Sequence, residues 1–195
     1  MPRISADTVA EHVAQQEAAV FDAAMRLFAE RGYAQVTLAD IGAEVGLKRN
    51  SLYRYFPDKA HIVLRWLRRE LPEQIAVTSE ILGDASTPPA ARLRAWALHQ
   101  LDYARRPEHR VLGEIGAITA ELDDDARAEL AASHRALLEP LDAPLRELGL
   151  DDDADRAATA TLLIELVVAA ARVEGRETNP ALRDRLLRAV DALAT

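Results

Sequence analysis

The chain contains no cysteine among its 195 residues. This absence excludes disulfide bonds, a thiol nucleophile and cysteine-based metal sites. Aromatic residues make up only 5% of the chain and there are only eight glycines, whereas alanine and leucine are abundant, which favours helices over strands. No apolar run approaches the ~20 residues that span a bilayer, and the N-terminus has no apolar signal segment. We therefore expect a soluble, cytoplasmic, all-α protein with no membrane association.

Signatures of catalysis are also missing. The five histidines are scattered without the spacing of metal ligands. Neither a phosphate-binding glycine loop nor a nucleophile elbow is present, and no pair of carboxylates falls in a predictable cleft. We expect a protein that is not an enzyme and that needs no metal or other cofactor.

Charge is unevenly divided along the chain. The net charge of −8 arises beyond residue 70, since residues 1–70 hold ten Lys and Arg against nine Asp and Glu. Within residues 47–70 seven basic side chains face only Asp58 and Glu70. A basic patch on an acidic body would orient the protein on a polyanion such as nucleic acid.

The most informative segment runs from Thr37 to Lys59. Thr37 is a good N-cap, with Asp40 in the favourable first turn. Gly46 can adopt the left-handed backbone that ends a helix. A second short helix then follows, and its polar positions can hydrogen-bond phosphates and base edges. This pattern predicts a helix-turn-helix whose second helix reads DNA.

The chemistry of the second helix suggests which residues contact bases. Arg49 can donate in a fork to guanine O6 and N7, and Asn50 can pair bidentately with adenine N6 and N7. Lys48 can contact either a base or a phosphate. So short a helix reads only about 3–4 base pairs, and specificity then requires two half-sites and a dimer.

The same segment resembles the DNA-binding domain of TetR-family transcriptional regulators. The resemblance rests on Phe28-Ala-Glu-Arg-Gly-Tyr, Thr37, Ile41, Gly46, Leu52-Tyr53, Tyr55-Phe56 and Lys59, and it covers roughly the first third of the chain. It implies a repressor that binds a palindromic operator in double-stranded DNA as a homodimer and is released by a small-molecule effector. The positions that contact the phosphate backbone in that family are Thr37, Ser51, Tyr53, Tyr55 and Lys59.

The rest of the chain is predicted to be helical. The expected helices are 11–31 in front of the motif, then 58–82 with a kink or break near Leu71, 90–106, 111–122, 126–148 with interruptions at Pro140 and Pro144, 154–174 and 180–194. We divide the chain into a helix-turn-helix domain of three helices, residues 1–57, and a helical effector-binding and dimerisation domain, residues 58–195.

The helix expected over 154–174 is apolar nearly all round, so a second subunit is needed to cover the side that its own core leaves open. The resemblance implies the same, and we expect a homodimer through residues near 126–148 and 154–174. Glu165 is the only charged residue between Arg156 and Arg172. It needs a partner if it is buried, either His134 or an arginine, or it reaches a ligand.

The effector itself has no signature in the sequence. The aromatic or polar-tipped residues best suited to line a cavity in the body are Trp66, Trp96, His99, Tyr103 and Glu165. Each also fits an ordinary place in the core. An alternative for the whole chain is a helical ligand-binding or interaction module that binds DNA only weakly.

Overall fold

The computed structural model describes residues 6–53, 55–175 and 177–194. Within these ranges every regular element is an α-helix or a short 3-10 helix, which confirms the predicted all-α class. In chain order they are α1 (Ala6–Arg31), η1 (Tyr33–Gln35), α2 (Leu38–Glu44), α3 (Arg49–Tyr53), α4 (Lys59–Gly83), α5 (Pro89–Ala104), η2 (Pro107–Glu114), α6 (Ile115–Glu121), α7 (Asp124–Leu138), η3 (Glu139–Leu141), α8 (Asp142–Glu147), α9 (Asp153–Glu174) and α10 (Pro180–Leu193). None of these helices is long and apolar enough to cross a membrane.

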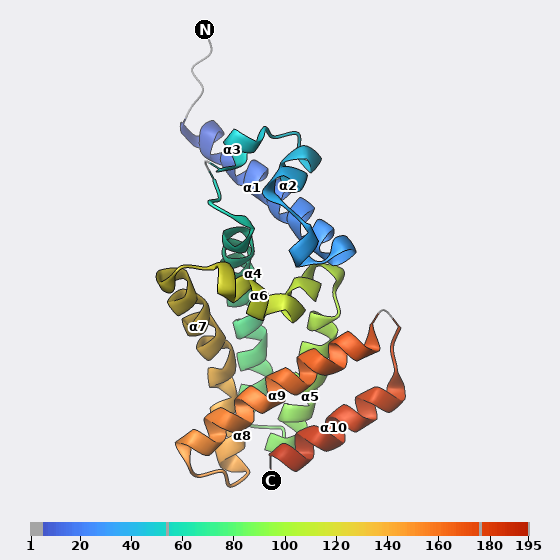
Figure 1. The fold of residues 1–195 in the computed structure, drawn as a ribbon. Coiled ribbons are helices and arrows are strands. Elements are labelled where there is room, and N and C mark those ends of the chain that lie inside the picture. The colour runs from blue at the N-terminus through green and yellow to red at the C-terminus, as the bar shows by residue number, and fades with distance from the viewer. Residues whose placement is uncertain (1–5, 54, 176, 195) are drawn as a thin grey trace.

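Helices α1, α2 and α3 form a small head at one end of the molecule (Figure 1). Their apolar faces meet around Phe21, Phe28 and Phe56, all of which are buried. The rings of Phe21 and Phe56 meet edge to face with their centroids 5.8 Å apart, a favourable geometry for an aromatic pair. The buried apolar side of the first helix is therefore part of a packed core.

The core of the head continues into the body. Val111, Ile118 and Leu122 belong to the same buried apolar cluster as Phe21 and Trp66. This cluster crosses the boundary expected at residue 57, and α4 runs through it from the head into the body (Figure 1). The head therefore packs on the body through a shared core.

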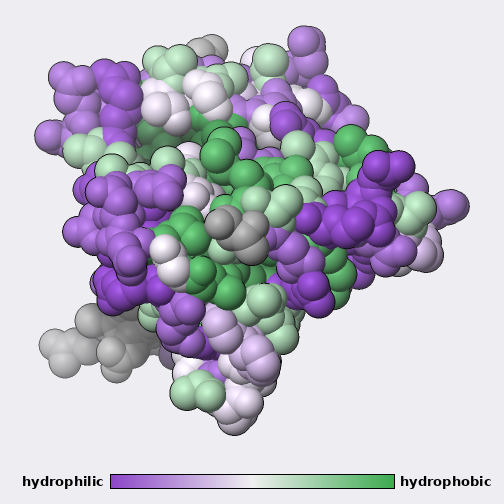
Figure 2. All heavy atoms as spheres, turned by 90° about the horizontal axis from the view of Figure 1, so that it is seen from below, coloured by the Kyte–Doolittle hydropathy of each residue, from purple (hydrophilic) through white to green (hydrophobic). Residues whose placement is uncertain are grey.

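A second core cluster fills the other half of the body. It gathers Trp96 on α5, Leu145 on α8, Val167 on α9 and Val190 on α10. Seen from below, apolar atoms lie at the centre of this end of the molecule inside a hydrophilic rim (Figure 2). The outer members of the second core are only partly buried, among them Leu138, Leu148, Leu182 and Leu193.

Two of the expected helices differ in form from the observed elements, and a third is interrupted at its prolines as expected. α4 continues through Pro72, where we expected a kink or break. Pro72 is exposed, so the carbonyl left without its helical donor faces water, and an uninterrupted helix is tolerated. The helix expected over 111–122 is 3-10 in its first part, η2, and α-helical only in α6. Pro140 and Pro144 do interrupt their helix, which is divided into α7, η3 and α8.

Two acidic runs, residues 123–125 and 151–153, each supply a helix cap. The Asp123 carboxylate accepts a hydrogen bond of 2.9 Å from the backbone N–H of Ala126, at the start of α7. Asp152 accepts one of 2.9 Å from Asp155 at the start of α9. Both carboxylates satisfy helix N–H groups that have no partner within the helix.

A buried carboxylate attaches α10 to the rest of the body. The side chain of Glu174 is 0% exposed and lies 2.9 Å from Nε of Arg183 and 3.0 Å from Nε of Arg105. It also accepts a hydrogen bond of 2.8 Å from the backbone N–H of Asn179. Burial by itself would raise the pKa of Glu174, but the hydrogen bonds and the two arginines outweigh burial, and the pKa is lowered.

We expect Glu174→Gln to lower the free energy of unfolding at neutral pH by about 1.5–3 kcal/mol, the range for hydrogen bonds to a charged group. Because the folded-state pKa lies below the unfolded value of about 4.3, the stability from this carboxylate is present above that pH and is lost as the pH falls through the folded-state pKa. Urea denaturation at neutral and acidic pH should show a smaller acid-induced loss for Glu174→Gln than for the wild type. Glu177→Gln, at an exposed position, is the matched control. A variant whose pH profile runs parallel to that of the wild type would contradict this role.

Candidate nucleic-acid interface and body cavity

The helix-turn-helix begins with the capping box that Thr37 and Asp40 predict. The backbone N–H of Asp40 donates to Thr37 Oγ1 over 3.2 Å, and the backbone N–H of Thr37 donates to Asp40 Oδ2 over 2.8 Å. The Thr37 hydroxyl also donates to Asp40 Oδ2 over 2.5 Å. These hydrogen bonds from Thr37 lower the pKa of Asp40. Thr37 is exposed, and in this structure its hydroxyl hydrogen is engaged by the cap.

Two glycines shape the turn between α2 and α3. Gly46 has a φ of +68°, the left-handed conformation predicted for it. The carbonyl of Gly42 accepts a hydrogen bond of 2.8 Å from the N–H of Leu47. A Cβ on Gly42 would lie 3.0 Å from the backbone oxygen of Leu47, so the turn would have to widen slightly to admit it. The chain can therefore reverse tightly and place α3 against α2.

α3 is a short helix at the outer edge of the head (Figure 1). The carbonyl of Lys48 accepts from the N–H of Ser51 over 2.8 Å, so Lys48 stands at the beginning of the helix, and its side chain is exposed. The side chains of Arg49 and Asn50, predicted to read bases, lie outside the described part of the structure. Their backbone belongs to the first turn of α3, which follows the exposed Lys48.

The predicted phosphate contacts after α3 differ in exposure. Tyr53 is 43% exposed, one of the few large apolar-bodied side chains that reach the surface. Ser51 and Tyr55 are half-buried, and Tyr55 packs against the core of the head. Tyr53 is thus the most accessible of these three side chains.

Lys59 is directed inward. Its Nζ donates a hydrogen bond of 2.8 Å to the carbonyl of Tyr33, lies 4.1 Å from the centroid of the Tyr33 ring and 3.9 Å from Glu121 Oε1. Only 16% of the side chain is exposed. The sequence placed Lys59 against a DNA phosphate, but in the structure its ammonium group joins the head to the body.

Tyr33 is the centre of that joint. Its N–H donates to Glu114 Oε1 over 2.9 Å, and its hydroxyl donates to Glu121 Oε2 over 2.8 Å. Burial, followed by the hydrogen bond to Glu121, raises the pKa of Tyr33 well above its usual range, so the hydroxyl remains a donor. Together, Tyr33, Lys59, Glu114 and Glu121 connect η1 and α4 to η2 and α6. Sequence reasoning missed this group because its members are up to 88 residues apart.

The body contains a mainly apolar cavity of about 190 Å³. Its walls come from α4, α5, η2, α6, α7 and α9, and half of the lining residues are Leu, Ile or Val. The polar side chains among them include Gln74, Gln100, Tyr103, His134 and Glu165. A small concave site with a few polar groups in an apolar lining is the usual form of a ligand pocket.

Of the five residues predicted to line such a cavity, Tyr103 and Glu165 do so. The other three lie elsewhere. Trp96 is buried in the second core cluster, and the Trp66 ring packs on that of His109 at 5.2 Å. His99 lies behind the cavity wall, with Nε2 3.1 Å from Gln74 Nε2 and 3.4 Å from Gln74 Oε1. Burial lowers the pKa of His99, so the ring is neutral near neutral pH and supports Gln74.

Glu165 needs no buried partner. Its side chain is exposed at the edge of the cavity, and no arginine or histidine of the described residues lies within 4.0 Å of its carboxylate. His134 is also exposed and lines the same cavity. The two groups named as a possible pair therefore flank one cavity without forming an ion pair.

Comparison with known proteins gives a consistent result. Residues 20–65, from the second half of α1 into α4, match a family described as bacterial regulatory proteins, tetR family. The chain is 25% identical over 189 residues to the HTH-type transcriptional repressor Rv1474c of Mycobacterium tuberculosis, covering 85% of this chain and 97% of that protein. It resembles SmeT, solved as a triclosan complex, with a TM-score of 0.57 and 26% identity over 92% of this chain and 90% of that one. It also shares its fold with the TetR family transcriptional regulator PfmR of Thermus thermophilus, with a TM-score of 0.68 and 20% identity over 90% and 96% of the two chains.

Lys48 and Lys59 make a matched pair for testing the inward orientation of Lys59. Lys59→Met removes a buried hydrogen bond and is expected to lower the free energy of unfolding by about 1–2 kcal/mol. It should leave the salt dependence of DNA binding unchanged. Lys48→Met should do the opposite: stability stays constant, and the slope of log affinity against log salt falls by about one, as for a lost phosphate contact. Thermal unfolding and DNA titrations over a salt series measure both quantities. If Lys59→Met reduced the slope of log affinity against log salt, the Lys59 side chain would not be directed inward when DNA is bound.

Proposed function

We propose that this chain, whose residues 20–65 match the tetR family of bacterial regulatory proteins, is a TetR-family regulator that represses transcription as a homodimer on a palindromic operator, from which a small-molecule effector releases it. The observation that carries the proposal is the exposed Lys48 directly before α3, which follows the capped α2 and the Gly46 turn. Each of the two heads would place one α3 in the major groove, and the two half-sites would lie one helical turn, ~34–36 Å, apart.

We assign different tasks to the residues of the head. Arg49 reads guanine and Asn50 reads adenine, because their side chains carry the matching donors and acceptors. Lys48, Ser51, Tyr53 and Tyr55 hold the phosphate backbone and set the register. Thr37 joins them when its hydroxyl hydrogen turns from Asp40 to a phosphate. Lys59 acts through the joint with Tyr33, which fixes the head on the body.

The face of α9 that supports dimerisation is apolar and exposed. Leu162 is 55% and Val173 is 73% exposed, and the partly buried Leu166 and Ala169 lie between them at helical spacing. Such side chains lose water-exposed area when a second copy packs on them, and a two-fold axis brings the same face from each subunit together. We place the centre of the dimer interface on α9; the contribution expected from residues 126–148 stays a prediction.

The effector is proposed to occupy the body cavity that Tyr103 and Glu165 line. A related protein, SmeT, was solved with triclosan bound, which supports a small-molecule ligand for this chain as well. An effector releases the operator only if it binds the DNA-incompetent arrangement of the heads more tightly than the competent one. The cavity adjoins α4 and η2, the elements that carry the joint, so its occupancy is well placed to change the tilt of the heads.

The first test is selection of genomic DNA fragments by the purified full-length chain. The wild type should enrich a palindromic motif, and Arg49→Ala should lose discrimination by about 1–3 kcal/mol, the worth of one bidentate base contact. Arg188→Ala, which changes an exposed arginine on α10, is the control and should select the same motif as the wild type. Equal losses of Arg49→Ala on selected and random duplexes would refute its role as a base reader. No enrichment by the wild type would favour a helical interaction module over a repressor.

Dimerisation is tested by Val173→Glu, measured by light scattering on eluted protein. Two glutamates buried near a two-fold axis would repel, and we expect the dimer to weaken on the order of 100-fold, about 2.7 kcal/mol. Ala117→Glu, an exposed position on α6, should remain a dimer. A monomeric wild type, or a variant as dimeric as the wild type, would contradict the proposed interface.

A further inference from the structure

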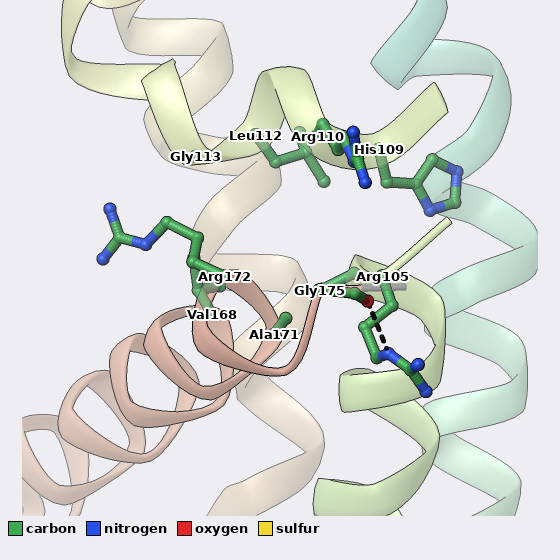
Figure 3. Close-up of a pocket in the computed structure, with 10 residues that line it drawn as sticks. Arg105, His109, Arg110, Leu112, Gly113, Val168, Ala171, Arg172 and Gly175 are labelled. Atoms are coloured by element: carbon green, nitrogen blue, oxygen red, sulfur yellow. Dashed lines mark hydrogen bonds between the residues drawn. The ribbon is translucent and has the colours of Figure 1, made fainter. Parts of the chain in front are cut away.

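The apolar cavity has a neighbour of different character. A second cleft of about 250 Å³ lies between the end of α5, η2 and the end of α9 (Figure 3). Ala104, Leu112, Gly113, Val168 and Arg172 line both spaces. The cleft is thus continuous in its walls with the cavity, and it stands on the side where η2 faces α9.

The cleft is rich in positive charge, although the chain carries a net charge of −8. Arg105, Arg110 and Arg172 all line it. Arg105 is neutralised, because it pairs with Glu174 at 3.0 Å and donates to the carbonyl of Gly175 over 3.1 Å (Figure 3). Arg110 and Arg172 are exposed, and neither has a carboxylate of the described residues within 4 Å. They are the two cations available to a ligand.

Arg172 connects the cleft to the cavity. A Cβ on Gly113 would lie 3.4 Å from Arg172 Cδ, so the stem of Arg172 rests against the backbone of η2. In Figure 3 its guanidinium points outward, away from Arg105. An exposed arginine changes rotamer in picoseconds to nanoseconds, and from this position the guanidinium can serve an anion at the rim. His109 also lines the cleft, but its Nδ1 donates to the Tyr103 carbonyl over 2.7 Å and its ring is buried.

Polar groups inside the cavity give a ligand its direction. The hydroxyl of Tyr103 is buried and has no hydrogen-bond partner among the described residues. Burial raises the pKa of Tyr103 to about 12, so this hydroxyl keeps its proton and can donate. Glu165 lies two turns before Arg172 on α9, about 10 Å along the helix, and would repel an anion from that end. The charge pattern therefore places a negative group beside Arg172, away from Glu165.

We propose that the effector is an amphipathic monoanion, with an apolar body in the cavity and a carboxylate or comparable anionic group held by Arg110 and Arg172 in the cleft. This inference rests on the proposed effector function and names its ligand class. The unpartnered hydroxyl of Tyr103 can donate to an oxygen of the ligand. A neutral apolar molecule would use the cavity alone and leave both arginines unused.

The cleft is also in direct structural contact with the head. Arg110 belongs to η2, which packs against α1, and the last residue of η2, Glu114, accepts the hydrogen bond from the Tyr33 N–H. An anion that bridges Arg110 and Arg172 links η2 to α9. This link acts on the contacts of Tyr33 that position the head. A ligand with a charged group would therefore affect DNA binding.

The test is calorimetric titration of the full-length protein with octanoate, octan-1-ol and acetate. Octanoate carries both parts of the proposed ligand, octan-1-ol only the apolar part and acetate only the anion. We expect octanoate to bind at least about tenfold more tightly than octan-1-ol, a difference of about 1.4 kcal/mol in binding free energy. Acetate should show no measurable binding. The double variant Arg110→Gln/Arg172→Gln should bind octanoate and octan-1-ol equally, whereas the control Arg188→Gln should keep the preference. Both changed arginines are exposed, so the fold should be retained.

Equal affinities of the wild type for octanoate and octan-1-ol would overturn the proposal. So would the absence of saturable octanoate binding, or a preference that survives in the double variant. DNA titrations on the same proteins separate this inference from the proposed function. Octanoate binding without specific DNA binding would refute the repressor and leave the ligand class intact, whereas specific DNA binding without octanoate binding would do the reverse.

Discussion

The position of the short helix α3 depends on the core that the head shares with the body. α3 spans only Arg49–Tyr53, too few residues to form a stable helix alone. Leu52 and Phe56 anchor its region in a cluster that also contains Val111, Ile118 and Leu122 from the body. A movement of η2 and α6 against α4 therefore cannot leave the head unchanged, because close-packed interiors transmit displacement.

Polar contacts fix the geometry of the apolar interface between the head and the body. Burying apolar area is non-directional, and several arrangements of head and body would bury similar areas. The hydrogen bonds of Tyr33 to Glu114 and Glu121, with Lys59 on the Tyr33 carbonyl, select one of them. These groups are partly buried and satisfied, the condition under which polar networks specify a unique packing. The same network connects the body to the head that carries α3.

The body uses arginines in two ways. Arg92 and Arg156 are buried and tie carbonyls and carboxylates of neighbouring segments together, and Glu174 does the same between Arg105 and Arg183. These groups hold the helices of the body in place. Arg110 and Arg172 stay exposed beside a cleft, where their charge remains available.

The sequence alone was enough to predict the interactions between residues that are close together in the chain. Helix caps and turns depend on residues close together in the chain, as the capping box of Thr37, the left-handed Gly46 and the aspartate caps show. The all-α class and the helix-turn-helix could therefore be predicted. Tertiary structure alone decided the direction of side chains that have more than one possible partner. Lys59 turned inward because the Tyr33 carbonyl, 26 residues away, lay within reach. The cavity is lined by Tyr103 and Glu165, but not by Trp66, Trp96 or His99. The reason is that helix packing determines which face of α4 and α5 meets α7 and α9. The spacing of apolar residues predicts that one face of a helix is buried. Only the packing of helices distant in the chain determines which residues that face contacts.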